Sequence, residues 1–464
     1  MTDCVLIACP GRTDPIRDTY DGPVLHIVRH YHPVHVVLIL SEGIKQLGLF
    51  DSIKKAVETV APECRVSGGS KTITNPFSFD ALAGVMPLLC NDVKKKFPGR
   101  KILINISSGT AQMQAALCMI AMLDPETYVP IQVNAPSQRS AQETPFDPEK
   151  DDLESWMETN QDNLPGFPSR CSEPKLLNFQ RPMLQMQLAS LVRNYDYSGA
   201  YQLYEDNRTG FPARTGWLLL HAERRLNLEY IEAQKAVNNL KLKKEELDRI
   251  YPVKLSQIAR LTDYYNSMKV KQQRKELNDF ILRLEVLTAY SACYLLEKCL
   301  GIPREEIADR SGDKRYEKYI LSADKCRQRL PGLMEYLDHQ FSETRLGRFQ
   351  WSEPLTALST AYICVFCCST MAPYRKYEDC AREMLQWALL SGPVRNPAAH
   401  TTMAITEQEI QNAYDGKGSR ALCTAIESVF CRMFASEAKA DVIKAAFAVY
   451  EQLNDMILEM PSTR

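Results

Sequence analysis

Short, continuously apolar runs alternate with longer segments of helical periodicity over roughly the first 135 residues of the chain. Apolar runs that do not alternate with polar residues are typical of strands that are covered on both faces. The repeated order of strand and helix predicts a parallel, doubly wound, Rossmann-like sheet. The expected strands are Val5–Pro10, His35–Leu40, Arg65–Ser67, Lys101–Ile106 and Tyr128–Val133, and the expected helices are Pro23–Tyr31, Phe50–Val60, Phe79–Phe97 and Ala111–Leu123.

The rest of the chain has a different pattern. An acidic, polar and proline-rich segment, residues 143–174, ends the α/β part and contains one short helical pattern at Leu153–Glu158. Beyond it the apolar residues follow helical spacing, and we expect no further strand. A polar and basic stretch, Asn266–Glu276, marks a second boundary between a small helical region and a larger helical domain. The main expected helices are Met183–Asn194, Gly216–Leu228, Leu277–Leu300, Gly332–Phe341, Pro354–Met371, Tyr377–Leu390, Ile405–Ala413, Ser419–Phe434 and Ala438–Met460. The fold class is therefore α/β plus all-α.

The charge balance limits how this protein can contact nucleic acid. The 464 residues include 56 Lys and Arg and 57 Asp and Glu, which gives a net charge of −1. A protein that coats nucleic acid through a global basic field is strongly positive. Any contact with nucleic acid must therefore be confined to a local pocket or cleft, and we expect no stable binding to DNA.

The cysteines and the apolar segments indicate a cytoplasmic protein. Fifteen cysteines are scattered along the chain, and the N-terminus MTDCVLIACPGR has no basic region before its apolar run, so it predicts a strand and not a secretory leader. The charge-free stretch between Glu353 and Arg375 predicts a buried core helix and no membrane span. Its Cys364, Cys367 and Cys368 resemble half a zinc site without a partner pair, and the histidines of residues 26–35 are divided between a helix and a turn. We expect no metal site.

The segment from Asn105 to Gln112 (NISSGTAQ) is the most informative turn of the first domain. It places small hydroxyl residues and a glycine between a buried strand and the helix that begins at Ala111. A helix N-terminus offers free amides and a positive dipole end, which suits a phosphate or a nucleotide sugar. No G-x-G-x-x-G follows the first strand and no lysine follows the glycine, so the turn is neither a dinucleotide fingerprint nor a P-loop. The structural alternative is a capped helix N-terminus alone.

Further polar turns should gather at the same edge of the sheet. Gly11, Arg12 and Thr13 follow the first strand, and Ser41 and Glu42 follow the second. In doubly wound sheets, ligands bind at the carboxyl ends of the strands. Several glycine-containing or polar turns at one edge therefore strengthen the prediction of a ligand site.

The segment Ser391–His400 (SGPVRNPAAH) contains a second candidate site. Gly392 and Pro393 are expected to end one helix, and Asn396 with Pro397 is expected to cap the next one. On that register Arg395 and His400 occupy the two positions that meet in a hydrophobic staple. A guanidinium that binds phosphate and an imidazole that exchanges a proton suit cleavage of a phosphodiester by the adjacent 2′-hydroxyl, without a metal.

Two other pairs of arginine and histidine have a similar spacing in the sequence. They are Arg29 with His35 and Arg214 with His221. The spacing alone is therefore a weak signal, and a purely structural role for Arg395 and His400 remains an alternative.

Three segments together resemble a known family. Residues 13–31 contain TDPIR, DGP and HIVRHY, residues 105–113 contain NISSGT and QM, and residues 395–400 read RNPAAH. In order and in spacing these segments resemble the motifs of the Csm-type ancillary ribonucleases of type III CRISPR systems, which are CARF–HEPN proteins. The middle helical region matches this family by position only.

The resemblance implies three domains and an activity. It implies a CARF domain over residues 1–172 that binds a cyclic oligoadenylate, a helical linker domain over 173–268, and a HEPN ribonuclease domain over 269–464. It implies a homodimer in which the activator and the single-stranded RNA substrate both lie across the two-fold axis. Relatives with this turn mostly respond to cyclic hexa-adenylate, cyclic tetra-adenylate being the alternative, and some members also cleave their activator.

The resemblance also assigns roles to residues. Ser108 and Thr110 are the first candidates to contact the activator, and Asn105 shapes the turn. In the second site His400 acts as general acid or base, Arg395 holds the phosphate, and Asn396 orients the pair. The products would carry a 2′,3′-cyclic phosphate, and no cofactor is required. The whole activator site would comprise Gly11, Arg12, Thr13, Ser41, Glu42, Asn105, Ser107, Ser108, Gly109, Thr110 and Gln112.

Two function classes remain beside a nuclease. A ligand-gated transcription regulator would need a basic helix-turn-helix or winged module, and we find none in the C-terminal half. A scaffolding protein would use Arg395 and His400 only to brace a dimer. Assays of DNA binding and of RNA cleavage distinguish these classes.

Overall fold

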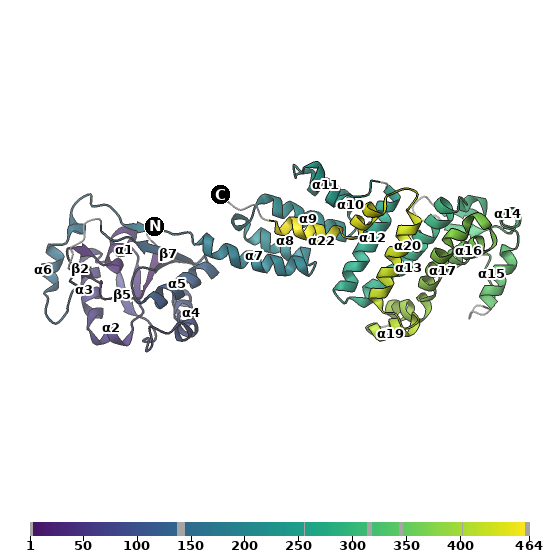
Figure 1. Ribbon diagram of the computed structural model, residues 1–464. Coiled ribbons are helices and arrows are strands. Elements are labelled where there is room, and N and C mark those ends of the chain that lie inside the picture. The colour runs from purple at the N-terminus through teal and green to yellow at the C-terminus, as the bar shows by residue number, and fades with distance from the viewer. Residues whose placement is uncertain are drawn as a thin grey trace. The chain divides into compact units, whose positions relative to one another are not determined.

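The computed structural model describes residues 3–136, 144–254, 256–312, 318–342, 347–400 and 402–459 (Figure 1). The chain divides into two compact units, Met1–Met183 and Leu184–Arg464. The first unit contains the large sheet, and the second unit is mainly helical.

Six strands form one sheet in the order β5, β4, β1, β6, β7, β8. Leu6 of the central strand β1 lies opposite Val36 of β4 and Leu103 of β6, and all pairs except the last are parallel. The predicted parallel sheet is confirmed. Strand β8 was not predicted: it pairs antiparallel with β7, and two residues are too short to leave a pattern in the sequence. The bounds are β1 Cys4–Ala8, β4 His35–Leu38, β5 Arg65–Gly68, β6 Lys101–Asn105, β7 Tyr128–Val133 and β8 Cys171–Ser172.

Helices cover both faces of the sheet (Figure 1). Leu6 belongs to a core that it shares with α1 and α3, whereas Val5 and Ile7 belong to a second core with α4 and α5. Successive side chains of a strand point to opposite faces, so one continuously apolar strand fills two cores. The helices of this unit are α1 Pro23–Tyr31, α2 Glu42–Gln46, α3 Leu49–Val60, α4 Phe79–Lys96, α5 Ala111–Leu123 and α6 Leu153–Glu158.

The first helices of the second unit form a small core with the last helix of the chain. Helix α22 packs against α9 and α11. Arg225 of α9 pairs with Asp263 of α12, both nearly fully buried, with Nη2 and Oδ1 2.5 Å apart. The bounds are α7 Leu177–Arg193, α8 Tyr197–Asp206, α9 Ala213–Leu226, α10 Tyr230–Asn238, α11 Lys244–Ile250, α12 Ser256–Gln273 and α22 Val449–Leu458.

A larger core joins α12 to the remaining helices. Helix α13 lies against α12, α16 and α17, and α17 lies against α20 (Figure 1). The apolar helix α16 is almost entirely buried, as its charge-free sequence predicted. The bounds are α13 Leu277–Tyr294, α14 Ala323–Arg329, α15 Leu333–Ser342, α16 Ala357–Thr370, α17 Glu378–Leu389, α18 Asn396–His400, α19 Glu407–Ala413, α20 Ser419–Met433 and α21 Ala440–Phe447.

The second unit differs from the sequence prediction in three places. A hairpin of β9 (Ala308–Ser311) and β10 (Lys318–Leu321) lies where no strand was expected, because the β9 sequence ADRS is mostly polar and exposed. The segment predicted as one helix over Ala438–Met460 is divided into α21 and α22. Helix α12 continues through residues 266–273, where a boundary was expected. The division between linker domain and ribonuclease domain stays a prediction.

All fifteen cysteines are free thiols. Cys364, Cys367 and Cys368 are fully buried in α16. Burial raises the pKa of Cys367 and of Cys368 to about 12, so both are neutral thiols near pH 7. In the described part of the chain, no helix combines the length and the apolar character that crossing a membrane requires.

Candidate activator site and ribonuclease motif

The order of the strands places two of the predicted turns at the point where the sheet changes direction. From β1 the chain builds outward through β4 and β5, and then returns to β6 on the other side of β1. Ligands of doubly wound sheets bind in the crevice at this switch point. The turn after β1, which contains Gly11, and the turn after β6, which contains Gly109, flank it.

The turn after β6 is held by its own side chains. The Asn105 amide donates a hydrogen bond to Oγ of Ser108 (3.0 Å) and accepts one from the backbone N–H of Ser107 (2.9 Å). Oγ of Ser107 accepts a hydrogen bond from the backbone N–H of Val133 in β7 (2.7 Å). Because Asn105 and Ser108 are at most 1% exposed, these hydroxyl and amide groups fix the turn from inside.

Thr110 caps helix α5. Its hydroxyl accepts a hydrogen bond from the N–H of Met113 (3.3 Å) and donates one to the carbonyl of Pro76 (2.5 Å). The turn therefore forms the capped helix N-terminus that is the structural alternative to a ligand site. It does not exclude a ligand, because one side-chain oxygen satisfies only one of the free amides of a helix N-terminus.

Gly11 and Gly109 bring the two turns into close approach. A Cβ added to Gly11 would lie 3.2 Å from the backbone nitrogen of Gly109. Gly109 has a φ of +84°, and a Cβ there would lie 3.1 Å from the carbonyl oxygen of Cys9. The sequence therefore needs small residues at both positions.

The buried carboxylate of Asp14 supports the turn after β1. It accepts hydrogen bonds from the backbone N–H groups of Gly11 (3.0 Å) and Val24 (2.9 Å). Burial raises the pKa of Asp14 even though these hydrogen bonds and one from Ser108 oppose the shift. Asp14 was not among the predicted site residues, and its only sequence signal is its place in the TDPIR segment.

The remaining predicted residues differ in exposure. Arg12 and Glu42 are exposed, Thr13 and Gln112 are partly exposed, and Ser41 is buried. Ser41 precedes α2 and pairs with Ile73, so it lies at the end of the neighbouring strand β4. The solvent-facing part of this sheet edge is therefore formed by backbone near Gly11 and Gly109 and by the exposed side chains around them.

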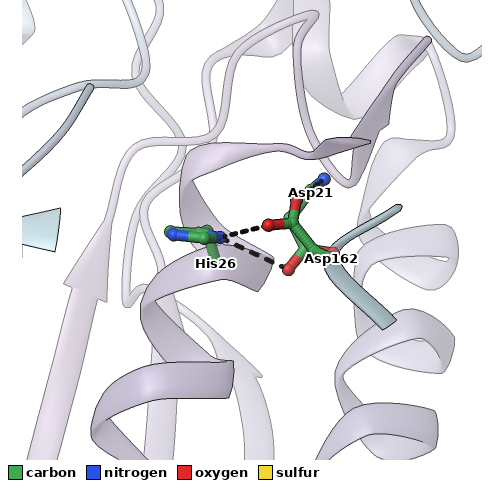
Figure 2. Close-up of side chains that lie close together, drawn as sticks. All are labelled: Asp21, His26 and Asp162. Carbon is green, nitrogen blue, oxygen red and sulfur yellow. Dashed lines mark hydrogen bonds and ion pairs between the residues drawn. The ribbon is translucent and has the colours of Figure 1, made fainter. Parts of the chain in front are cut away.

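A buried polar cluster lies beside this sheet edge. Asp21, His26 and Asp162 come from β3 (Tyr20–Asp21), α1 and the 3-10 turn Gln161–Asn163 (Figure 2). Nδ1 of His26 lies 3.3 Å from Oδ1 of Asp162 and 3.6 Å from Oδ2 of Asp21. Among the described residues this is the one group of three side chains whose spacing could hold a metal ion.

Two arginines already neutralise the carboxylates of this cluster. Nε of Arg29 lies 2.7 Å from Oδ2 of Asp21, and Nη2 of Arg170 lies 2.9 Å from Oδ2 of Asp162. Two guanidinium groups against two carboxylates leave no excess negative charge for a cation. The cluster therefore fits a structural role, tying α1 to the segment that precedes β8.

The charges in the cluster stabilise one another. Burial lowers the pKa of His26, but hydrogen bonds to Asp162 and Asp21 outweigh it, so the pKa lies above its usual value. Burial raises the pKa of Asp21, but hydrogen bonds from His26 and Arg29 outweigh it and the net shift is downward. The shift of Asp21 favours its carboxylate. The backbone N–H of Arg170 donates a hydrogen bond to Nε2 of His26 (2.9 Å), so that nitrogen is unprotonated and the ring is neutral in this arrangement.

The candidate ribonuclease motif, Ser391–His400, has a different backbone from the one expected. Residues Ser391–Arg395 form a π turn in which the N–H of Arg395 bonds to the carbonyl of Leu390 (3.2 Å). This turn leads directly into α18, so Asn396 is the first residue of that helix and does not cap it. The predicted staple register is therefore wrong, because the chain remains helical through Gly392 and Pro393. Single π turns occur frequently at functional sites.

The side chains of the motif are open to solvent to different degrees. His400 is exposed and Arg395 is partly exposed. Nε of Arg395 lies 2.6 Å from Oε2 of Glu285 on α13, and its Nη1 donates a hydrogen bond to Oδ1 of Asn396 (3.2 Å). Sequence reasoning missed Glu285, because nothing local connects it to a residue that lies more than one hundred positions later.

The two other pairs of arginine and histidine are engaged elsewhere. Arg29 binds Asp21, and His35 lies 2.8 Å from Oγ of Ser67. His221 is fully buried, and burial together with the nearby Arg225 lowers the pKa of His221 to about 3. A histidine that stays neutral near pH 7 cannot act there as a general acid. These contacts favour the third pair, Arg395 and His400.

Three family models match the chain in sequence order. They are the Cas_Csm6 CARF domain over residues 63–171, the 6H domain of the CRISPR-associated protein Csm6 over residues 174–226, and the Cas_Csm6 HEPN domain over residues 250–458. The sheet edge beside Gly109 lies within the first match, and the π turn with α18 lies within the last.

Similar proteins and structures agree with these matches. The chain is 28% identical over 461 residues to the CRISPR system endoribonuclease Csm6 of Mycobacterium tuberculosis, covering 98% of each chain. It is 33% identical over 215 residues to the Csm6 of Enterococcus italicus, covering 44% of this chain and 49% of the relative. The structure of the Enterococcus italicus protein bound to cyclic hexa-2′-fluoro-hexa-dAMP superposes with a TM-score of 0.69 and 21% identity, covering 99% of this chain and 100% of the other.

Proposed function

Because this chain belongs to the Csm6 family of CARF–HEPN proteins, we propose that it is an endoribonuclease that a cyclic oligoadenylate activates during type III CRISPR defence. The names of its relatives support the nuclease activity. The observation that carries the proposal is the π turn and α18, which present an exposed His400 and a partly exposed Arg395 within the HEPN match.

Cyclic hexa-adenylate is the proposed activator. A structural neighbour that shares this fold over almost the whole chain is bound to a cyclic hexanucleotide analogue. The turns at Gly11 and Gly109 supply backbone amides at the switch point of the sheet, where phosphates of such a ring can bind. Cyclic tetra-adenylate remains the alternative, and cleavage of the activator is a possible second activity.

Exposure decides how the predicted residues contribute to this site. Ser108 and Asn105 are buried and hydrogen bonded to each other, so they shape the turn. The other residues are exposed or partly exposed and so lie within reach of a ligand: Gly11, Arg12, Thr13, Glu42, Ser107, Gly109 and Gln112. Thr110 contributes the N-terminus of α5.

His400 and Arg395 carry the proposed chemistry. His400 acts as general base on the RNA 2′-hydroxyl or as general acid on the leaving oxygen. Arg395 binds the scissile phosphate and offsets its developing charge, and Asn396 orients the guanidinium through their hydrogen bond. The products carry a 2′,3′-cyclic phosphate and a 5′-hydroxyl, and activity persists in EDTA. Two chains supply two such pairs to one composite cleft.

One contact favours a second candidate function. The ion pair between Arg395 and Glu285 occupies the guanidinium within its own chain. If this pair is permanent, Arg395 is structural and the protein is a ligand-binding scaffold. The activator would then bind without any cleavage of RNA.

The test compares wild-type protein with His400→Ala and with His339→Ala. His339 is also exposed and lies on α15, outside the motif, so it controls for loss of an imidazole. With cyclic hexa-adenylate, His400→Ala should lose about 10²–10⁴-fold in RNA cleavage, the usual contribution of a general acid or base. Activator affinity should not change. Retained cleavage by His400→Ala would remove His400 from the mechanism, and no cleavage by wild-type protein would favour the scaffold.

A further inference from the structure

Helix α13 carries a groove directly beside the ribonuclease motif. Glu285, which contacts Arg395, lies one helical turn before Ala289, and Ala289 lines a cavity of about 220 Å³. Tyr290, Cys293 and Arg304 line both this cavity and a larger one of about 510 Å³. The two cavities therefore share part of their wall, and we call them together the groove. It begins about 6 Å along the axis of α13 from Glu285.

Aromatic side chains line the larger part of the groove. Tyr290 of α13 is 67% exposed, Tyr230 at the start of α10 is 38% exposed, and the partly exposed Tyr264 of α12 also lines the cavity. Exposed tyrosines of this kind are available for stacking, since each presents a flat face to solvent. The aliphatic parts of Leu261 and Leu287 form the floor and are buried.

Positive charge accompanies these rings. Arg260, Lys298 and Arg304 line the larger cavity, and its one acidic residue, Glu297, is paired with Arg304. The smaller cavity adds Lys318. In a chain whose net charge is −1, this is a local excess of cations over anions. The net charge of the chain implies that nucleic acid can bind only in a local basic cleft, and this groove is such a cleft.

Aromatic faces that alternate with cations along a groove are the recognition chemistry of single-stranded nucleic acid. The bases stack on the rings, and the phosphates meet the cations. An apolar ligand would not use the charges, and an acidic peptide would not use the exposed rings in this way.

We propose that this groove, formed by Tyr230, Tyr264, Tyr290, Arg260, Lys298 and Arg304, binds the stretch of single-stranded RNA next to the cleaved linkage. The proposal rests on the proposed function of Arg395 and His400. It adds a substrate-binding site that the motif itself does not contain. Helix α13 is the common support, because it packs against both the π turn and α18 and also carries Ala289 and Tyr290 of the groove.

The experiment measures the affinity of a fluorescein-labelled, single-stranded RNA by anisotropy, with His400→Ala in every protein so that the RNA stays intact. Tyr290→Ala and Tyr230→Ala should each weaken binding about fivefold or more, the loss of one stacked base. Tyr290→Phe should retain the affinity. Phe179→Ala removes an equally exposed aromatic ring, 68% against 67%, from the other unit and should change nothing.

The cations are tested through salt dependence. Lys298→Glu should weaken binding and reduce the slope of log Kd against log salt by about 0.7 for each phosphate that the variant no longer neutralises. Lys235→Glu, on α10 and outside the groove, is the matched control.

Three outcomes decide the proposal. Weaker binding by the groove variants, with unchanged binding by the two controls, supports RNA binding at the groove. If wild-type protein binds RNA there without cleaving it, the proposed function fails and the groove is an RNA-binding site only. Unchanged affinity in all groove variants overturns it while leaving the nuclease intact. A change from dimer to monomer in Tyr290→Ala, measured by light scattering, also overturns it, because the groove would then be an interface between two copies of the chain.

Discussion

The turn after β6 and the π turn with α18 differ in whether their polar side chains are buried or open to solvent. In the first, the Asn105 and Ser108 side chains are buried and hydrogen bonded to each other. In the second, His400 is exposed and Arg395 is partly exposed. In the turn after β6, buried side chains fix the backbone, and the backbone amides face the sheet edge. In the π turn with α18, the helical backbone holds the side chains of Arg395 and His400 toward solvent. The first turn is held by hydrogen bonds within one chain, whereas the second leaves the side chains of Arg395 and His400 open to solvent.

The largest expected effect on activity comes from removing the guanidinium of Arg395. Arg395→Ala should lower activator-stimulated RNA cleavage by about 10²–10³-fold, because it removes a charged donor from the developing negative charge. Arg395→Lys should recover part of this loss, since lysine keeps the charge but not the two-point geometry. Single-turnover cleavage rates measure both. Equal rates for all three proteins would show that Arg395 is structural.

The proposed role of the backbone near Gly109 is tested by adding a methyl group at that residue. Gly109→Ala places a Cβ 3.1 Å from the carbonyl oxygen of Cys9 in a left-handed conformation, which should cost about 1–3 kcal/mol of stability. Because the turn then shifts, activator affinity should fall roughly tenfold, as about 1.4 kcal/mol predicts. Calorimetric titration with cyclic hexa-adenylate measures it.

Gly84→Ala is the matched control for this change. Nothing lies within 4 Å of a Cβ at Gly84 in α4. Alanine in a helix interior is more stable than glycine, so this variant should bind the activator normally and melt slightly higher. If Gly109→Ala behaves in the same way, the backbone near Gly109 does not contact the activator.

A smaller effect is expected from the ion pair that holds Arg395. Glu285→Gln removes the negative charge opposite the guanidinium. Partly exposed ion pairs stabilise by up to roughly 1 kcal/mol, so cleavage without activator should rise by about two- to fivefold. Unstimulated cleavage by Glu285→Gln should be compared with that by Glu378→Gln, which breaks a similar ion pair with Arg382 at the end of α17 that lies away from the π turn. A fall in Glu285→Gln would mean that Glu285 positions Arg395 for catalysis.

The smallest effect on activity is expected from the buried cluster of Asp21, His26 and Asp162, which is tested through stability. Burial raises the pKa of Asp21, but hydrogen bonds from His26 and Arg29 outweigh it, so the pKa lies below its usual value of 3.8. The stabilising contribution of Asp21 is therefore fully present above about pH 4 and is lost as the pH falls through the lowered pKa. The difference in melting temperature between wild-type protein and Asp21→Asn should shrink as the pH falls from about 6 to about 2. Thermal melts monitored by circular dichroism measure it. A difference that grows as the pH falls would mean that Asp21 is protonated in the folded protein.

The sequence predicted what depends on local patterns. The strand β1 is evident because Cys4–Ala8 is apolar without interruption, and the turn after β6 is evident because small residues follow a buried strand. Strands β8 and β9 were missed because one has two residues and the other is polar. A two-residue strand owes its conformation to its neighbour, and a polar exposed strand owes it to hydrogen bonding across the hairpin.

The π turn shows a second limit. Gly392 and Pro393 usually end helices, and here tertiary packing against α13 holds the chain helical through them. Glu285 was missed for a related reason, since its partner Arg395 lies on another helix. Contacts within a local turn leave a pattern in the sequence and contacts between distant helices do not. The roles of the candidate-site residues stay predictions.

The ratio of RNA cleavage rates with and without cyclic hexa-adenylate tests the central claim most directly. A fluorogenic single-stranded RNA, in the presence of EDTA, should be cut at least about fivefold faster by wild-type protein with the activator, the lower end of ordinary allosteric coupling. Cyclic tri- and tetra-adenylate should stimulate less. Equal rates with and without every ring would contradict a sensor that controls a ribonuclease.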